Sequence, residues 1–534
     1  MQKLSFMDKG FLVSEKPETP MHVAGVTLYT LPDGVEEHEY LHGLAQILRN
    51  VDGFIPPFGE RLKMGRLGLS GDVFWERDPN IDIDYHIRHS ALPKPGRYRE
   101  LFNLVSRLHS SVLDRNRPLW EYHLIEGLQN RQFAVYSKTH HAAVDGMRSA
   151  HIMRSSLSTD PNTIIEESPL SLNRWNDYKK ALHAGQAQEL NQQELRNVAD
   201  RLQATFDSGK SFYQILKNSA QTYIRNDGSL TLPHMNVPRS SLNTTVHSAR
   251  RFVAQSWPFA RIRAVGTAFN GSFNDAVLAM CAGALRHYML RHSELPEESL
   301  KSMIPMSVRA KDDVDSSNAV ASLTVDLATN IQDPAKRFEV IKTSVRAGRD
   351  FYTGMSAQEI QVYSSLINAP GLILEQMGAS RVRPANNIVI SNVPGIQEQT
   401  YWNGARLDGS YPLSIVTDGM AVNITLVTNN QNVDFGIIAC RRSVPQVQRL
   451  IDYMEEALQE LEDAAGITAK PAAKSKTAAS KTKPKAKPKA KPKSKAKPKE
   501  EAKVKSKAKA KPKAKAKAKA KAKAKAKAKA KAKK

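Results

Sequence analysis

The residue types most able to do chemistry lie in one short segment, Thr139-His140-His141-Ala142-Ala143-Val144-Asp145-Gly146. A neutral imidazole titrates near working pH, so His140 or His141 could take a proton from a hydroxyl and return it to a leaving group. Asp145 could orient an imidazole or hold the loop through an ion pair, and Gly146 would permit a tight turn. The alternative is that two histidines simply end a strand.

A strand and a helix are predicted to position this segment. Residues Gln132–Thr139 include Phe, Val and Tyr, which are typical of strands, and Met147–Leu157 has a helical pattern. A loop between a strand and a helix can present its side chains to a cleft. We therefore expect the two histidines to lie on such a loop.

Several common catalytic motifs are absent from the sequence. It contains no GxGxxG, GxxxxGK[ST] or GxSxG pattern. Dinucleotide-binding, P-loop and nucleophile-elbow enzymes are therefore disfavoured. We expect no metal site.

Charge divides the chain into two parts. The 534 residues include 78 Lys and Arg against 53 Asp and Glu, a net charge of +25. Residues 470–534 contain 30 lysines, no arginine and two glutamates, a charge of +28, which leaves −3 for residues 1–469. The body is therefore nearly neutral, which excludes a nucleic-acid-binding fold for the whole chain. The tail alternates Lys with Ala and Pro and has little apolar surface to bury, so we expect it to be disordered.

The body is too long for one ordinary core, so two domains are expected. Further helices are predicted over Arg99–Leu113, Asn274–His292 and Val444–Glu462, and a strand over Asn387–Ser391. This irregular alternation predicts an α/β protein of the layered α+β kind. We place an N-terminal lobe at 1–185, a helical crossover at 186–245, a C-terminal lobe at 246–469 and the tail at 470–534.

Two distant cysteines, no secretory signal and no long apolar run favour a cytoplasmic protein.

The histidine segment resembles the HHxxxDG signature of the coenzyme-A-dependent acyltransferase superfamily, which includes chloramphenicol acetyltransferase and nonribosomal peptide condensation domains. Further blocks, in order between residues 3 and 462, are similar to bacterial wax ester synthase/diacylglycerol acyltransferases. They include Leu4-Ser5, Asp8, Phe11-Leu12, Glu15, Pro20-Met21-His22-Val23, Asp114, Pro118-Leu119-Trp120-Glu121, Asn274-Asp275, Pro305-Met306-Ser307-Val308-Arg309 and Ser391-Asn392-Val393-Pro394-Gly395. No single block is decisive, but the ordered set is specific.

The resemblance implies a role for each residue of the histidine segment. His141 would be the general base that deprotonates the acceptor alcohol, which then attacks the acyl-CoA thioester directly. His141 would next protonate the CoA thiolate, so that no acyl-enzyme is needed. His140 is expected to shape the loop. Asp145 is expected to pair with Arg309 and, with Gly146, to support the loop.

The resemblance also implies a substrate channel lined by Asn274, Ser391, Asn392, Pro394 and Gly395. Asn274 could instead cap a helix, for which Asn is well suited. The segment 391–395 could simply be a turn, since Asn, Pro and Gly favour turns. No cofactor is expected to be permanently bound; acyl-CoA is a co-substrate, and the residues that contact it are not predicted.

The implied fold has two chloramphenicol-acetyltransferase-like lobes with an apolar channel between them and His141 near its middle. The implied substrates are long-chain acyl-CoA and either a fatty alcohol or diacylglycerol, giving wax esters or triacylglycerol. Such an enzyme would lie peripherally on the inner membrane or on lipid bodies. The tail could bind DNA without sequence specificity, or anionic phospholipid.

Two alternatives remain open at this point. One is a related acyltransferase with another hydroxyl acceptor. The other is a non-catalytic protein that tethers DNA or lipid bodies, against which the intact His140, His141, Asp145 and Gly146 argue.

Overall fold

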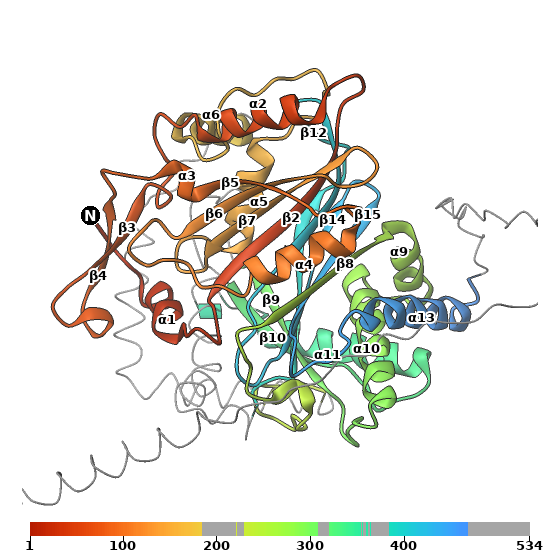
Figure 1. Ribbon diagram of the computed structural model, residues 1–534. Coiled ribbons are helices and arrows are strands. Elements are labelled where there is room, and N and C mark those ends of the chain that lie inside the picture. The colour runs from red at the N-terminus through yellow and green to blue at the C-terminus, as the bar shows by residue number, and fades with distance from the viewer. Residues whose placement is uncertain are drawn as a thin grey trace, which may run out of the picture. The chain divides into compact units, whose positions relative to one another are not determined.

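The computed structural model describes residues 1–183, 229–307, 320–353 and 384–467, together with 221, 355, 359–360 and 364. These residues form two six-stranded sheets, one small sheet and the helices that flank them (Figure 1). The architecture is therefore mixed α/β, as predicted. Most of the predicted crossover at 186–245 and all of the tail at 470–534 lie outside the described residues, so the predicted domain boundaries stay a prediction.

The first large sheet contains the strand that ends at the histidine pair. In spatial order its strands are β12 (Tyr401–Trp402), β13 (Ala405–Leu413), β2 (His22–Thr30), β7 (Gln132–His140), β6 (Trp120–Glu126) and β5 (Ile87–Ala91). All neighbours are antiparallel except β5 and β6. Strand β7 is buried at eight of its nine positions because both faces of the sheet are covered. The pairing of His22 with His140 fixes the register at its end.

The second large sheet belongs to the C-terminal half. Its strands, in spatial order, are β10 (Val320–Asp326), β9 (Lys301–Ser307), β11 (Ile388–Ile396), β14 (Val422–Asn429), β15 (Asn432–Cys440) and β8 (Arg250–Pro258). Strand β11 runs parallel to both β9 and β14, and the other pairs are antiparallel. A third sheet of three strands contains β1 (Gln2–Lys3), β4 (Val73–Arg77) and β3 (Glu60–Met64).

The C-terminal half of the chain contributes a hairpin to the first sheet. Strands β12 and β13 come from the C-terminal half, yet β13 pairs with β2 along the edge of the first sheet. The predicted division at residue 246 therefore does not separate the two sheets completely. The lobes are also joined where α4 (Tyr98–Leu108) meets the edge strand β8: the amides of Phe252 and Arg250 donate to the hydroxyls of Ser106 and Ser110, both at 2.9 Å.

Helices cover both sheets. In the first lobe they are α1 (Phe6–Ser14), α2 (Glu37–Arg49), α3 (Ile83–His86), α4, α5 (Gly146–Ser155) and α6 (Leu172–His183); in the second they are α9 (Phe259–Ala268), α10 (Phe273–Arg291), α11 (Pro334–Phe351) and α13 (Arg449–Ala464). Short 3-10 turns are η1 (Gly68–Ser70) and η2 (Ser241–Asn243). None of the helices in these described ranges is both long and apolar enough to cross a bilayer.

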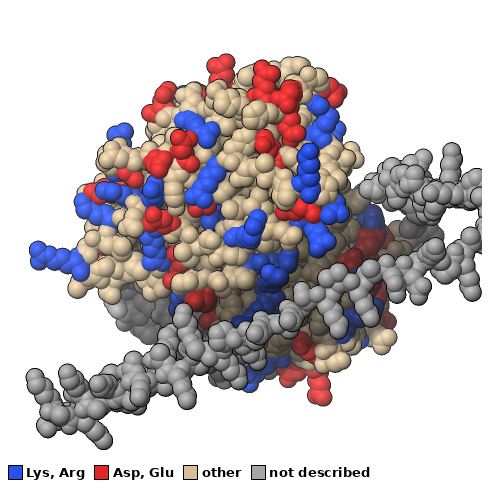
Figure 2. Space-filling model, in the orientation of Figure 1, with Lys and Arg blue, Asp and Glu red and all other residues tan. Residues whose placement is uncertain are grey.

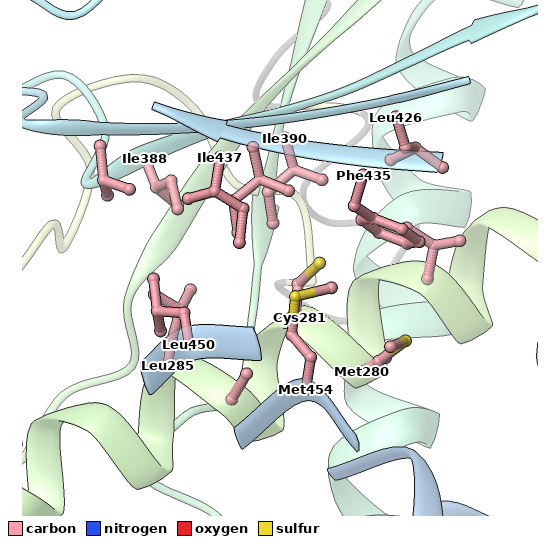
Figure 3. Packing of buried hydrophobic residues seen from close by; sticks show 14 of the residues in the cluster. Met280, Cys281, Leu285, Ile388, Ile390, Leu426, Phe435, Ile437, Leu450 and Met454 are labelled. Atoms are coloured by element: carbon pink, nitrogen blue, oxygen red, sulfur yellow. The ribbon is translucent and has the colours of Figure 1, made fainter. Parts of the chain in front are cut away.

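Helix α10 is the centre of the second core. It is apolar around its whole circumference, because it lies between the sheet and α13. Figure 3 shows Cys281 and Leu285 of α10 among side chains of the sheet, such as Ile437, and of α13, such as Met454. Gly283 makes this close crossing possible, since a Cβ there would lie 2.6 Å from that of Ala457.

The helix predicted over Arg99–Leu113 is shorter in the structure, where it ends at Leu108. The buried ammonium of Lys138 donates to the carbonyls of Leu108 and Ser111, both at 3.2 Å, and pairs with Glu121 at 3.1 Å. A tertiary contact from β7 thus satisfies the carbonyls at the end of the helix, which local sequence cannot reveal.

Charged side chains of both signs are interspersed over the visible face of the body, as Figure 2 shows. This mixture agrees with the near-neutral charge of residues 1–469.

Candidate active site

The histidine pair lies in the tight connection between β7 and α5, as predicted. His140 is the last residue of β7, and Asp145 is the N-cap of α5. The amide of His140 donates to Leu119 at 3.0 Å, and that of His141 donates to Met21 at 2.8 Å. The connection is therefore fixed by chain segments on both of its sides.

His140 is completely buried, and a polar group faces each of its two ring nitrogens. Its Nδ1 accepts a hydrogen bond from the Ala142 amide at 3.0 Å, so the proton of the neutral ring belongs on Nε2. Nε2 faces the Glu15 carboxylate at 3.4 Å. This arrangement fixes the ring and leaves it without access to a substrate.

Glu15 joins the histidine to a second charged residue. Its carboxylate accepts hydrogen bonds from the Met21 amide at 3.1 Å and from Arg115 at 2.9 and 3.1 Å. Burial raises the pKa of Glu15, but the facing His140 imidazole, the Met21 amide and Arg115 outweigh burial and hold the pKa below its ordinary value. Glu15 is therefore an ionised carboxylate behind the histidine loop.

His141 has a different environment from its neighbour. Its side chain is half-buried, and its ring stacks on Phe11 of α1 with the centroids 4.2 Å apart and an angle of 17°. Of the two imidazoles, His141 is thus the one with solvent access, while Phe11 restrains the plane of the ring.

Asp145 caps the helix that follows the loop. Its carboxylate accepts from the Arg148 amide at 2.9 Å, and only 2% of the residue is exposed. Arg309, its predicted partner, lies outside the described residues, so that ion pair stays a prediction. Gly146 does not form the predicted tight turn: it is the first residue of α5, and a Cβ there would meet nothing within 4 Å. The backbone at Gly146 therefore does not require glycine, and there is open space beside it.

Two of the residues predicted to line the channel meet in the second lobe. The Asn392 side-chain amide of β11 donates to the Asn274 carbonyl of α10 at 2.6 Å. The alternative in which Asn274 caps the helix is wrong, because Ser272 is the N-cap and forms a capping box with Asp275. The Asn274 side chain is thus used in a tertiary contact.

The segment 391–395 is part of strand β11, not a turn after it. Ser391 is in register with Thr425, and the strand has an irregularity between Val393 and Ile396, where Pro394 cannot donate to the ladder. A Cβ on Gly395 would lie 1.5 Å from the Thr428 carbonyl oxygen, so the close approach requires glycine.

This strand also meets the helix that follows the histidine loop. Arg154 of α5 donates to the Pro394 carbonyl at 2.8 Å. The contact brings β11 of the second lobe against the helix that follows the histidine pair of the first.

One sequence motif bears on the expectation that the chain has no metal site. His38-Glu39-Tyr40-Leu41-His42 has the HExxH spacing of zinc proteases. In the structure both histidines are exposed on α2, and no cluster within the described ranges has the three ligand side chains that would hold a metal ion. The two histidines therefore lie on a solvent-exposed face of α2.

The contacts of Phe11, Glu15 and Arg115 with the histidine loop were not predicted from the sequence. Phe11 and Glu15 lie in the N-terminal block that carries the family resemblance, but nothing local places them against residues 140 and 141. The only sequence signal for these contacts was the presence of a glutamate and an aromatic residue in that block.

Comparisons with known proteins identify the family of the chain. Residues 4–277 match the family model of the wax ester synthase/diacylglycerol acyltransferase catalytic domain, and residues 316–462 match the WS/DGAT C-terminal domain. The chain is 41% identical over 466 residues to the probable diacylglycerol O-acyltransferase tgs2 of Mycobacterium tuberculosis, covering 86% of this chain and 98% of that one. It is 36% identical over 473 residues to the O-acyltransferase WSD of Acinetobacter baylyi, covering 88% and 98%.

Solved structures give the same result. The wax ester synthase/diacylglycerol acyltransferase of Marinobacter aquaeolei VT8 superposes with a TM-score of 0.68 at 36% identity, covering 87% of this chain and all of that one. The first condensation domain of the calcium-dependent antibiotic synthetase superposes with a TM-score of 0.53 at 14% identity, covering 88% and 97%, which shows a shared fold alone.

The fold is thus two-lobed and condensation-like, and the chain is an acyltransferase, as predicted. The chain belongs to the wax ester synthase/diacylglycerol acyltransferase family.

Proposed function

We propose that His141 is the general base of an acyl transfer from long-chain acyl-CoA to a fatty alcohol or diacylglycerol. Its imidazole takes the proton of the acceptor hydroxyl as the oxygen attacks the thioester carbonyl. When the C–S bond breaks, the imidazole gives that proton to the CoA thiolate. The observation that carries this assignment is the contrast within the pair: His140 is fully buried, with its Nδ1 bonded to the Ala142 amide, whereas His141 is only partly buried on the same loop.

The residues around His141 position the loop and its imidazole. Phe11 holds the plane of the His141 ring, and Glu15 holds His140 behind it. Asp145 fixes the start of α5, and Gly146 leaves room beside the loop. Arg309 is proposed as a further partner of Asp145.

The second lobe contributes the opposite wall of the proposed channel. Ser391, Asn392, Pro394 and Gly395 lie on β11, and Asn274 is joined to that strand through Asn392. The hydrogen bond from Arg154 to Pro394 supports this placement, because it links α5 to β11. Relatives named as wax ester synthase and diacylglycerol O-acyltransferase support the choice of acceptors.

The decisive experiment measures CoA release from palmitoyl-CoA with hexadecanol and with diacylglycerol, each beside a reaction without acceptor. A general base contributes roughly 10²–10⁴-fold, so His141→Ala should lose about that factor in acceptor-dependent release. His42→Ala, which removes an exposed histidine of α2, is the matched control and should keep full activity. Release that survives in His141→Ala would overturn the assignment of the base.

We further propose a cytoplasmic enzyme that lies peripherally on the inner membrane or on lipid bodies. The 30 lysines of residues 470–534 favour binding to a polyanion, either DNA or anionic phospholipid. Deletion of residues 470–534 should remove salt-sensitive binding to both and leave turnover of soluble substrates intact. Loss of that turnover would contradict a purely localising role.

A further inference from the structure

The turn between β3 and β4 exposes aliphatic side chains. In this hairpin tip, residues 63–71, Leu67 is 75% exposed and Met64 is 44% exposed. Leu69 packs instead against the core of the first lobe, so the tip is anchored while Leu67 faces solvent. Aliphatic groups gathered at one hairpin tip and rimmed by polar residues are typical of an interaction site, unlike single exposed apolar residues.

The charges of the tip are positive. It contains Lys63 and Arg66, both exposed, and no acidic residue. Asp72, which directly follows the tip, pairs with Lys3 at 2.9 Å, and Glu76 of β4 pairs with Lys63 at 2.5 Å. An apolar point flanked by cations complements an interface between anionic headgroups and acyl chains.

The tip is mechanically joined to the active site through α1. The Lys9 ammonium donates to the Gly71 carbonyl at 2.8 Å, and Figure 1 shows α1 beside the β3–β4 hairpin. On the same helix Val13 is 43% exposed, and Phe11 stacks on His141. Whatever the tip contacts therefore lies near the helix that covers the catalytic imidazole.

We propose that residues 63–71 insert into the surface of an anionic phospholipid layer and so bring α1 and His141 to the lipid that holds the acceptor. This inference rests on the proposed function for the nature of the acceptor. A tip of nine residues is smaller than the roughly 20–30 residues that each partner contributes to a stable protein interface, whereas a lipid layer accepts a single inserted leucine.

Insertion can be measured in the full chain, independently of the tail, with a solvent-sensitive fluorophore. Both native cysteines, Cys281 and Cys440, are buried, so Leu67→Cys can be labelled selectively with nitrobenzoxadiazole. Ile164→Cys, at an aliphatic position that is 63% exposed elsewhere on the first lobe, is the matched control. With phosphatidylglycerol vesicles the label at 67 should brighten and shift to the blue, while the label at 164 should not.

Three results would overturn the proposal. They are an unchanged label at 67, an equal change at both positions, or a change at 67 that needs only higher protein concentration, which would indicate a second copy of the chain.

A functional measurement separates docking from chemistry. Leu67→Ser should reduce turnover of diacylglycerol in phosphatidylglycerol vesicles by about tenfold, the effect of losing one inserted leucine. Turnover of a short-chain acyl-CoA with a soluble alcohol should be unchanged, and Ile164→Ser should match the unsubstituted chain in both assays. An equal loss of turnover in both assays would refute docking through the tip. An absence of turnover by the unsubstituted chain would refute the proposed function, and the fluorescence result would then decide whether the tip docks.

Discussion

Asp434→Asn should change how stability depends on pH. Asp434 of β15 is fully buried, and its carboxyl group accepts from the Ser256 hydroxyl at 2.5 Å, the Ser410 amide at 2.7 Å and the Asn429 side chain at 3.0 Å. Ser410 belongs to β13, the strand that crosses to the first sheet, so this group ties the two sheets together. Burial raises its pKa from 3.8 to about 6, although the three hydrogen bonds oppose the rise.

The size of the effect follows from this pKa. Between about pH 4 and pH 6 the folded protein retains a proton that the unfolded chain has lost, so its stability falls as pH rises through that window. A rise of about two pKa units corresponds to about 3 kcal/mol of free energy of unfolding, and the folded protein has lost all of it above about pH 6. An Asn side chain, like a neutral carboxylic acid, has both a donor and an acceptor and carries no charge. The free energy of unfolding of Asp434→Asn should therefore equal that of the unsubstituted protein near pH 4. Near pH 7.5 it should be higher by up to about 3 kcal/mol.

Urea unfolding followed by tryptophan fluorescence from about pH 4 to about pH 7.5 measures this difference. Asp33→Asn, at an exposed aspartate, is the control and should give a curve parallel to that of the unsubstituted chain. A parallel curve for Asp434→Asn would refute the argument, as would a uniform loss of stability.

Two other substitutions test the site and the sheet. Glu15→Gln removes the charge that faces His140 and Arg115, so it should lower stability by about 1.5–3 kcal/mol and also lower kcat; unchanged melting and turnover would contradict the role of Glu15. Gly395→Ala places a Cβ 1.5 Å from the Thr428 carbonyl, so it should lower the melting temperature by many degrees or prevent folding. Gly146→Ala, with open space beside it, should melt like the unsubstituted protein, and equal melting of the two variants would refute the steric argument.

Local patterns predicted the elements around the histidines. The helix expected over Asn274–His292 is α10 with each end shifted by one residue, and the strand expected over Gln132–Thr139 is β7 with one residue added. Apolar periodicity and turn residues are properties of neighbouring positions, so the connection between β7 and α5 could be placed from sequence.

Contacts between distant segments could not be predicted in this way. The pairing of β13 with β2 joins positions nearly 380 residues apart, and the stacking of Phe11 on His141 joins two separate elements. The segment 391–395 looked like a turn because Pro and Gly favour turns, yet the neighbouring strand β14 holds it as an irregular strand. Tertiary context decided each of these cases.

The central claim is that a hydroxyl activated at His141 attacks the thioester directly. The most direct test is rapid-quench measurement of CoA released in the first turnover from palmitoyl-CoA without any acceptor. Direct attack predicts no burst of CoA and no acylated protein, with release beginning only when hexadecanol or diacylglycerol is added. A burst of one equivalent of CoA, with palmitate bound covalently to the protein, would contradict the account.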